Sequence, residues 1–341
     1  MRSPPPVQAR CPQPPGKSRL AVRARALRVG SAVSDSGVIE RIDAFCDAVP
    51  RERARAEAIG ALVLFVPMGT GFPYYARPRT GQRPAATAAD VRAVRARQRE
   101  LLIPESFEWV ERTAPDMAAA ATEAGLAVHA HPLLVLGSLG PAPRLPERIE
   151  VRIMNAEDPD LILAWAVPGV AFNYPGTAIG EASVTERDKI AADHDAATIE
   201  LLRDRLRSRE SVLATASGPN GPLAAGSYQL ADGTAEITGI GVLPASRRRG
   251  LAAGVTRALA AHALASGART VFLSATDATV ARIYTRLGFR EIGTAMIAEP
   301  PGDESLLYPA WLSSLGRDPA RLTLARRAGV SPDRAEHSRV R

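Results

Sequence analysis

The sequence predicts an α/β (α+β) fold of two tandem lobes, each a central mixed, mostly antiparallel sheet flanked by helices. Three observations predict it. Residues 241–289 alternate apolar strands with amphipathic helices, and residues 61–136 repeat the order strand, helix, strand, helix, strand found from Glu236 to Ile297. The chain has 341 residues, which is longer than one typical domain.

A strand, a turn and a helix in the second lobe suit a bulky anionic ligand. Ile237–Leu243 is predicted to be a strand that ends at Pro244, because proline has no N–H to donate. A helix begins near Leu251, and its first N–H groups lack partners and carry the positive end of the helix dipole. They form an anion site, which Gly250 opens to a phosphate and Arg247–Arg249 strengthen with charge.

A second strand and helix follow this turn. Thr270–Ala275 is β-branched and apolar, as expected of a buried strand. Asp277 is a good N-cap, apolar residues then recur at helical spacing, and Gly288 closes the helix. By spacing alone, Tyr284 is one more residue on the buried face of that helix.

Together these segments resemble the GNAT superfamily of acetyl-CoA-dependent N-acyltransferases. Arg247, Gly250 and Ala252 fit the family's Q/R-x-x-G-x-G/A loop, which cradles the pyrophosphate of coenzyme A. The segment D-x-x-x-A-x-x-Y-x-x-x-G-F, from Asp277 to Phe289, is similar to the family's second conserved block. The tyrosine of that block commonly protonates the departing thiolate, so the resemblance implies that Tyr284 is the general acid.

The resemblance also implies a set of residues for coenzyme A. The pantetheine arm would pair with backbone groups of Ile240–Val242 like an added strand, and a backbone N–H near Val242 would hold the oxyanion. The expected cofactor-binding residues are Ile240, Val242, Leu243, Arg247, Arg248, Arg249, Gly250, Leu251, Ala252, Ala253 and Asp277. Acetyl-CoA is the expected co-substrate, and no metal is expected because the sequence has no Cys/His cluster.

Glu236 is the candidate general base. It lies on the strand before the loop, eleven residues ahead of Arg247, and some lysine-acetylating members of the superfamily carry their base at this spacing. Burial beside apolar strand residues would raise its pKa toward neutrality, where a base works best. Two alternatives stay open at this point: a water-facing glutamate on an edge strand, or proton removal through ordered water.

The chain divides by composition and motif. The expected segments are a disordered basic leader (1–37), a degenerate GNAT-like lobe (38–145), a catalytic GNAT acetyltransferase domain (146–300) and a tail that is partly helical and then disordered (301–341). The first lobe lacks the loop, and Ala121 stands where the acid would be, four residues before Gly125. We expect this lobe to act as a scaffold that closes one wall of the acceptor cleft.

Local patterns give further expectations. Helices are predicted over Val38–Ala48, Arg51–Ile59 and Val184–Arg209, and the last would carry Asp193, His194 and Asp195 on its surface. Strands are predicted over Ala61–Pro67, Phe72–Ala76, Phe107–Val110 and Leu126–Leu136, with a hairpin before Glu236.

The charge distribution argues against a nucleic-acid partner. The chain has a net charge of +7, but residues 1–37 hold seven Lys/Arg against one acid, and residues 301–341 hold seven against five. The body between them is therefore near neutral, unlike a nucleic-acid-binding domain. The sequence has no apolar run that could span a membrane and no signal-peptide core, so a cytoplasmic protein without a membrane partner is expected.

The leading functional hypothesis is an N-acetyltransferase that acts by direct attack on a small-molecule or peptide amine, as a monomer or homodimer. Neither Cys11 nor Cys46 has a paired His at recognisable spacing, which disfavours a covalent enzyme intermediate. The alternative hypothesis is a coenzyme A-binding sensor or partner-binding module with little transferase activity.

Overall fold

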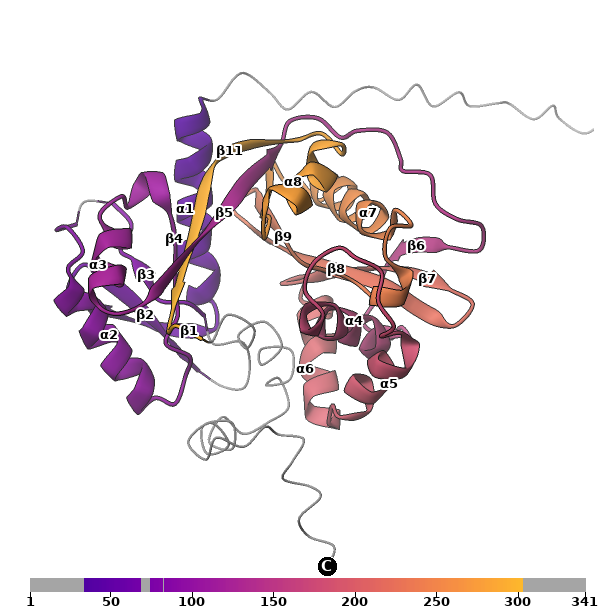
Figure 1. The fold of residues 1–341 in the computed structure, drawn as a ribbon, viewed down its shortest axis with the longest axis horizontal. Coiled ribbons are helices and arrows are strands. Elements are labelled where there is room, and N and C mark those ends of the chain that lie inside the picture. Colours follow the sequence, from indigo (N-terminus) through magenta and orange to yellow (C-terminus); the bar gives the residue numbers. More distant parts are fainter. Residues whose placement is uncertain (1–33, 69–73, 82, 303–341) are drawn as a thin grey trace, which may run out of the picture.

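A computed structural model describes residues 34–68, 74–81 and 83–302. Its strands form an eight-stranded sheet in the order β4-β11-β5-β10-β9-β8-β7-β6 and a three-stranded sheet β1-β2-β3 (Figure 1). The elements of the first half are α1 (Asp35–Arg51), β1 (Ala54–Ile59), β2 (Leu62–Pro67), β3 (Arg77–Pro78), α2 (Ala88–Glu100), β4 (Phe107–Val110), the 3₁₀ helix η1 (Glu111–Thr113), α3 (Met117–Glu123) and β5 (Ala127–Leu136).

The elements of the second half are β6 (Glu150–Ile153), α4 (Leu161–Asn173), α5 (Val184–Ala192), α6 (Ala196–Arg207), β7 (Val212–Gly218), β8 (Gly221–Ala231), β9 (Thr234–Val242), the 3₁₀ helix η2 (Pro244–Ser246), α7 (Leu251–Ala265), β10 (Thr270–Ser274), α8 (Ala278–Thr285) and β11 (Phe289–Glu299). The mixed α/β architecture predicted from the sequence is confirmed.

Strand β5 joins the two halves of the chain. It lies between β10 and β11 and is antiparallel to both, while β4 extends the sheet beyond β11. Residues Leu133–Leu136 of β5 are buried, as expected of an apolar strand with neighbours on both sides and helices on both faces. The large sheet therefore contains strands from both halves, whereas β1–β3 form a small sheet of their own.

Helices cover the two faces of the large sheet differently. On one face, α7 and α8 pack on a core that includes Val255, Leu259 and Tyr284. On the other face lies α1, whose Phe45 meets Phe272 of β10 edge-on, with ring centroids 5.4 Å apart. Helix α4 also contacts β8 and β9. Helix α2 packs on β1 and β2 of the small sheet, and α3 packs on α2 and on β5 and β11 of the large sheet (Figure 1).

The first half differs locally from the predictions. The helix expected over Arg51–Ile59 is wrong: α1 ends at Arg51, and Ala54–Ile59 is strand β1. Its alanines alternate with Arg55 and Glu57, a period of two, and Gly60 at a φ of +56° turns the chain into antiparallel pairing with β2. Residues 35–37, placed in the leader, form the first turn of α1, whose N-cap is Ser34.

The charged helix of the second half is also different. The chain from Val184 forms two helices, because Asp195 accepts a hydrogen bond from the backbone N–H of Thr198 at 2.8 Å and so starts α6 as its N-cap. The predicted strand at Phe72–Ala76 lies partly outside the described residues, and its last residue forms an isolated bridge with Phe107. Residues 1–33 and 303–341, most of the predicted leader and tail, also lie outside them.

Gly288, between α8 and β11, is expected to accept no side chain. Its φ is +97°, and a Cβ there would overlap the carbonyl oxygen of Ser138. Gly288→Ala should lower the free energy of unfolding by about 3 kcal/mol or more, because left-handed strain and overpacking add.

Gly267→Ala is the matched control for that substitution. Gly267 has nearly the same φ, +96°, but no described atom lies within 4 Å of its Cβ position, so only strain of about 1–2 kcal/mol is expected. Urea denaturation measures both variants. Equal losses of stability would contradict the proposed clash with Ser138.

Candidate active site

Strands β9 and β10 pair over a short stretch and then separate. The parallel pairing joins Thr234–Glu236 to Thr270–Phe272 and stops there. Residues Ile237–Val242 of β9 continue without a described partner on that side, while β10 stays paired with β5. The separation leaves a wedge between β9 and β10, whose unpaired backbone edge can accept an extended ligand as an added strand.

A bulge shapes the same part of β9. Ala225 of β8 pairs with Gly241 and Ser227 pairs with Thr238, so the register shifts at Gly239 and Ile240. Gly239 has a φ of +64°, and its Cβ position faces open space. The bulge therefore interrupts the β8–β9 ladder beside the wedge and alters the direction of its backbone groups.

The predicted phosphate loop begins a helix, as expected. The 3₁₀ turn Pro244–Ser246 leads to Gly250, the N-cap of α7, with a φ of +79° that suits glycine. The backbone N–H groups of Leu251–Ala253 donate to no described residue. Arg248 and Arg249 are exposed and form no ion pair within the described chain. The loop thus presents orphan N–H groups and two guanidinium groups, which suits an anion.

Other residues assigned to the ligand have different side-chain partners. The guanidinium of Arg247 donates to the carbonyl oxygens of Ala171, Tyr174 and Ala178, at 3.0, 2.5 and 3.1 Å. Arg247 therefore anchors the loop to the end of α4 and the chain after it, and its side chain is not available to a phosphate. Asp277, also assigned to the ligand, accepts the N–H groups of Thr279 and Val280 as the N-cap of α8.

Four of the residues expected to bind coenzyme A differ in how deeply their side chains are buried. Leu243 and Leu251 are buried in hydrophobic clusters, so only their backbone could contact a ligand. The N–H of Leu243 is itself bonded to the carbonyl oxygen of Leu223 at 2.9 Å. Ile240 and Val242 are half-buried along the free edge of β9.

Glu236 lines a cavity of about 200 Å³ beneath the wedge. The cavity lies between α1 and the sheet, and it reaches Thr238 on β9 and Ser274 on β10, the two sides of the separation. Its wall comes from both halves of the chain: Phe45, Cys46, Val49, Pro50, Tyr74, Tyr75, Glu108, Trp165, Arg205, Ser211, Ser227, Gln229, Glu236, Ile237, Thr238, Ser274 and Ile297. The wedge and the cavity therefore meet at Glu236.

Burial and neighbouring charges shift the pKa values of the carboxyl groups that line this cavity. Burial and, to a smaller extent, the charge of Glu108 together raise the pKa of Glu236 to about 8, against the opposing charge of Arg77. Burial also raises the pKa of Glu108, while Arg77 lowers it. Arg77 is itself buried and donates to Asp43 of α1. At neutral pH Glu236 is therefore largely protonated, as expected for a carboxyl group beside apolar strand residues.

Glu108 was missed by the sequence analysis. It lies on β4, which three strands separate from β9 in the sheet order, yet its charge acts on Glu236. The available signal was a single acidic residue inside the apolar strand Phe107–Val110. Such a residue is costly to bury unless its charge is paired and hydrogen-bonded, so its presence in the strand points to a charged partner or a ligand.

Tyr284 does not line the cavity of Glu236. Its side chain is 7% exposed in the core beneath α7 and α8, and its ring meets Phe289 edge-on at 6.2 Å. Glu236 faces α1 on the opposite side of the sheet. The two candidate catalytic residues thus lie on opposite faces, with the wedge between β9 and β10 separating them.

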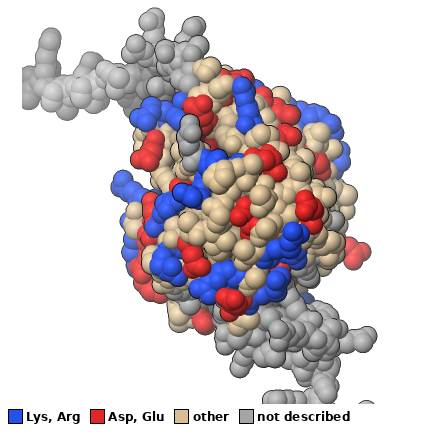
Figure 2. Space-filling view, turned by 90° about the vertical axis from the view of Figure 1, so that its left-hand side faces the viewer, with Lys and Arg blue, Asp and Glu red and all other residues tan. Residues whose placement is uncertain are grey.

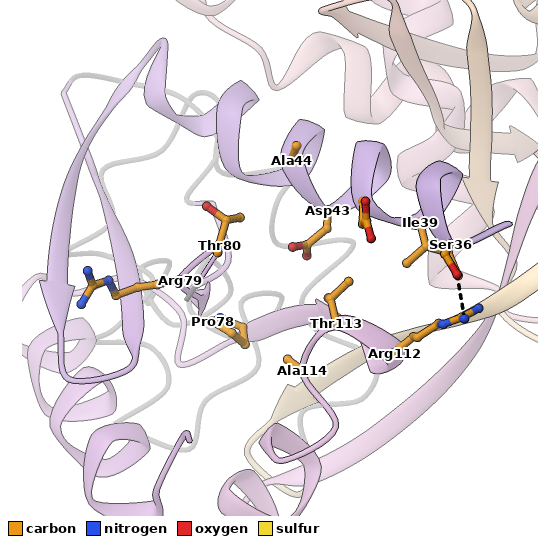
Figure 3. A pocket seen from close by; sticks show the side chains of 12 residues that line it. Ser36, Ile39, Asp43, Ala44, Pro78, Arg79, Thr80, Arg112, Thr113 and Ala114 are labelled. Carbon is orange, nitrogen blue, oxygen red and sulfur yellow. Dashed lines mark hydrogen bonds between the residues drawn. The ribbon is translucent and has the colours of Figure 1, made fainter. Parts of the chain in front are cut away.

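A larger hollow, of about 600 Å³, lies elsewhere on the first half, between α1 and the chain around Pro78 and Thr113 (Figure 3). Asp43 points into it, and Arg112 at its rim donates to Ser36 at 2.8 Å. None of the site residues predicted from the sequence lines this hollow.

The surface has mixed charge. On the face in Figure 2, Lys and Arg side chains are interspersed with Asp and Glu. Within the described part of the chain, no helix is both long and apolar enough to cross a bilayer.

Known proteins resemble both the sequence and the fold. Residues 216–297 match the family model described as FR47-like protein, and no curated protein matches the chain. A GCN5-related N-acetyltransferase from Kribbella flavida has a TM-score of 0.55 at 22% identity, over 77% of this chain and 96% of that one.

Two further solved structures are less similar. A tandem GNAT protein from the clavulanic acid biosynthesis pathway has a TM-score of 0.44 at 16% identity, over 70% of this chain and 78% of its own. A GCN5-related N-acetyltransferase-like protein from Streptococcus suis has a TM-score of 0.46 at 10% identity, over 78% and 99%. The fold assignment therefore rests on the Kribbella flavida protein.

The FR47-like segment runs from the end of β7 to β11 and so contains the wedge, the loop before α7 and Tyr284. The large sheet around that segment has the fold of a GCN5-related N-acetyltransferase. This chain is therefore a GNAT-fold protein that carries FR47-like sequence in residues 216–297.

Proposed function

We propose that this protein is an N-acyltransferase that moves an acetyl group from acetyl-CoA to the primary amine of a small molecule or peptide. One observation carries the proposal: the wedge between β9 and β10 opens directly onto a cavity lined by Glu236. A thioester in the wedge and an amine in the cavity would meet there, so that positioning supplies much of the rate.

The residues around the wedge suit acetyl-CoA. The N–H groups of Leu251–Ala253 and the side chains of Arg248 and Arg249 would bind the diphosphate. The open edge at Ile240–Val242 would pair with the pantetheine amides, and a backbone N–H near Val242 would hold the oxyanion. Gly250 adds no side chain beside the phosphates, and its φ of +79° is one that glycine adopts readily.

Direct attack needs a base and an acid on the two sides of the thioester. Glu236, once ionised, would take a proton from the substrate ammonium, and the amine nitrogen would form a bond to the carbonyl carbon. As the C–S bond breaks, Tyr284 would protonate the departing thiolate. Glu236 and Tyr284 lie on opposite faces of the sheet, which is consistent with one acting as base toward the amine and the other as acid toward the thiolate.

The alternative function is a coenzyme A-binding sensor, and one experiment separates the two. The protein should bind acetyl-CoA 1:1 by calorimetry and release free thiol when a suitable primary amine from a panel is added. Tyr284→Phe should lower turnover roughly 10- to 1,000-fold and leave acetyl-CoA affinity nearly intact, because only the proton donor is lost.

Phe289→Leu serves as the control for packing, since Phe289 contacts the Tyr284 ring and carries no hydroxyl. Binding without thiol release from any amine would favour the sensor. Unchanged turnover in Tyr284→Phe would remove Tyr284 from the acid role.

A further inference from the structure

Arg205 of α6 stands out among the residues that line the cavity of Glu236. Its side chain forms no hydrogen bond or ion pair with a described residue, and its Nε is shielded from solvent without a partner. Glu210 acts on its charge, but that carboxylate is already paired with Arg53 at 2.5 Å. The guanidinium group of Arg205 thus faces the cavity with no hydrogen-bond or ion-pair partner among the described residues.

Burying the Arg205 guanidinium without a counter-charge costs free energy. Burial lowers the pKa of Arg205, because a charged group loses hydration that nothing in the cavity replaces. A bound anion would restore both the charge balance and the forked hydrogen bonds that guanidinium groups make with carboxylates.

The same cavity carries acidic groups on other elements. Glu236 of β9 and Glu108 of β4 line it from the sheet, whereas Arg205 lines it from α6. Aromatic side chains, those of Phe45, Tyr74 and Trp165, contribute to the wall. The cavity therefore offers carboxylates to an ammonium, a guanidinium to an anion, and apolar surface to the body of the ligand.

We infer that the acceptor is an amino-acid-like zwitterion, whose amine meets Glu236 and Glu108 and whose carboxylate pairs with Arg205. This inference rests on the proposed acetyl transfer and names its substrate class. A polyamine fits worse, since Arg205 would repel a second cation. A simple amine would provide no anion to pair with Arg205.

The test uses matched acceptors that differ only in the carboxylate: leucine with 3-methylbutylamine, phenylalanine with 2-phenylethylamine, and 5-aminopentanoate with butylamine. In the intact protein at least one carboxylate-bearing probe should have a kcat/KM roughly 10- to 100-fold above that of its partner, as one charge-assisted pair provides. Arg205→Gln should abolish that preference, so that the kcat/KM values of the two members of each pair come within about twofold of each other.

Arg203→Gln is the matched control on the same helix. Arg203 is ion-paired with Glu200 at 3.4 Å and does not line the cavity, so its loss should leave the preference unchanged. Thermal unfolding of both variants checks that α6 remains folded. A preference that survives Arg205→Gln would overturn the inference.

The inference and the proposed function can fail separately. Equal kcat/KM values within every probe pair would overturn the inference of a zwitterionic acceptor and leave the proposed acetyl-transfer function standing. If acetyl-CoA does not bind, the proposed function fails. Calorimetry with the same probe pairs then tests whether the cavity binds a zwitterion more tightly than a simple amine. Carboxylate-bearing probes that bind no tighter than their partners would overturn the zwitterion site in that case too.

Discussion

Gly250→Asp is expected to weaken acetyl-CoA binding at least about 100-fold, close to 2.7 kcal/mol. The substitution places a carboxylate at the N-cap of α7, beside the orphan N–H groups of Leu251–Ala253. Aspartate is a good N-cap and tolerates a left-handed φ better than most residues, so the helix should still form. Its charge would repel the diphosphate and occupy the N–H groups that the ligand needs.

Gly267→Asp is the control for this effect. Gly267 lies just past the other end of α7, has a φ of +96°, and has no described atom within 4 Å of its Cβ position. The two variants share the change of charge and the strained backbone but differ in distance from the proposed phosphate site. Calorimetry should show near wild-type affinity for Gly267→Asp. Equal affinity in both variants would exclude the start of α7 as the diphosphate site.

Glu236→Gln is expected to lower kcat/KM by about 100- to 10,000-fold above pH 8, because the amide cannot take a proton. In the wild-type protein kcat/KM should rise with pH through about 8, where half of the Glu236 carboxyl groups are ionised, and level off about one to two pH units higher. The variant should lose that ionisation from its pH–rate profile. Glu236→Asp should restore part of the activity, since it keeps a carboxylate. An unchanged profile in Glu236→Gln would assign proton removal to water or another group.

The same substitution should alter the pH dependence of stability. The pKa of Glu236 is raised in the folded protein to about 8, so the folded state holds a proton that the unfolded chain releases near pH 4.5. This contribution to stability is full at low pH and falls, by up to about 1.4 kcal/mol per pH unit, as pH rises toward 8. Glu236→Gln should therefore unfold at a higher temperature than wild type at pH 9. Any gain should be small at pH 5.

The local sequence was sufficient to predict the elements that caps, turn residues and apolar spacing define. The loop before α7 could be predicted because Pro244, Gly250 and the apolar spacing after Leu251 each fix backbone conformation within a few residues. Asp277 as the N-cap of α8 follows in the same way. The period of Ala54–Ile59 was misjudged because alanine suits a helix intrinsically, and pairing with β2 overrode that preference.

The cavity could not be derived locally. Glu108, Arg205 and Glu236 lie on three separate elements, and no spacing in the chain indicates that β4 and α6 reach the same space as β9. Arg205 has no side-chain hydrogen bond within the described residues and Arg247 has three, and this difference is likewise a result of packing. From the sequence, Arg205 and Arg247 have the same capacity to bind an anion. Only the residues packed around each side chain show that their hydrogen bonding differs.

By itself, the sequence determined the mixed α/β class, the start of α7 and the strand that carries Glu236, because these depend on turn chemistry and apolar periodicity. Tertiary structure alone decided that β5 lies between β10 and β11, that β9 and β10 separate after Glu236, and that α1 covers the cavity below. The physical reason is that strand partners and buried charges are chosen by contacts between residues far apart in the chain, and those contacts have no local signature.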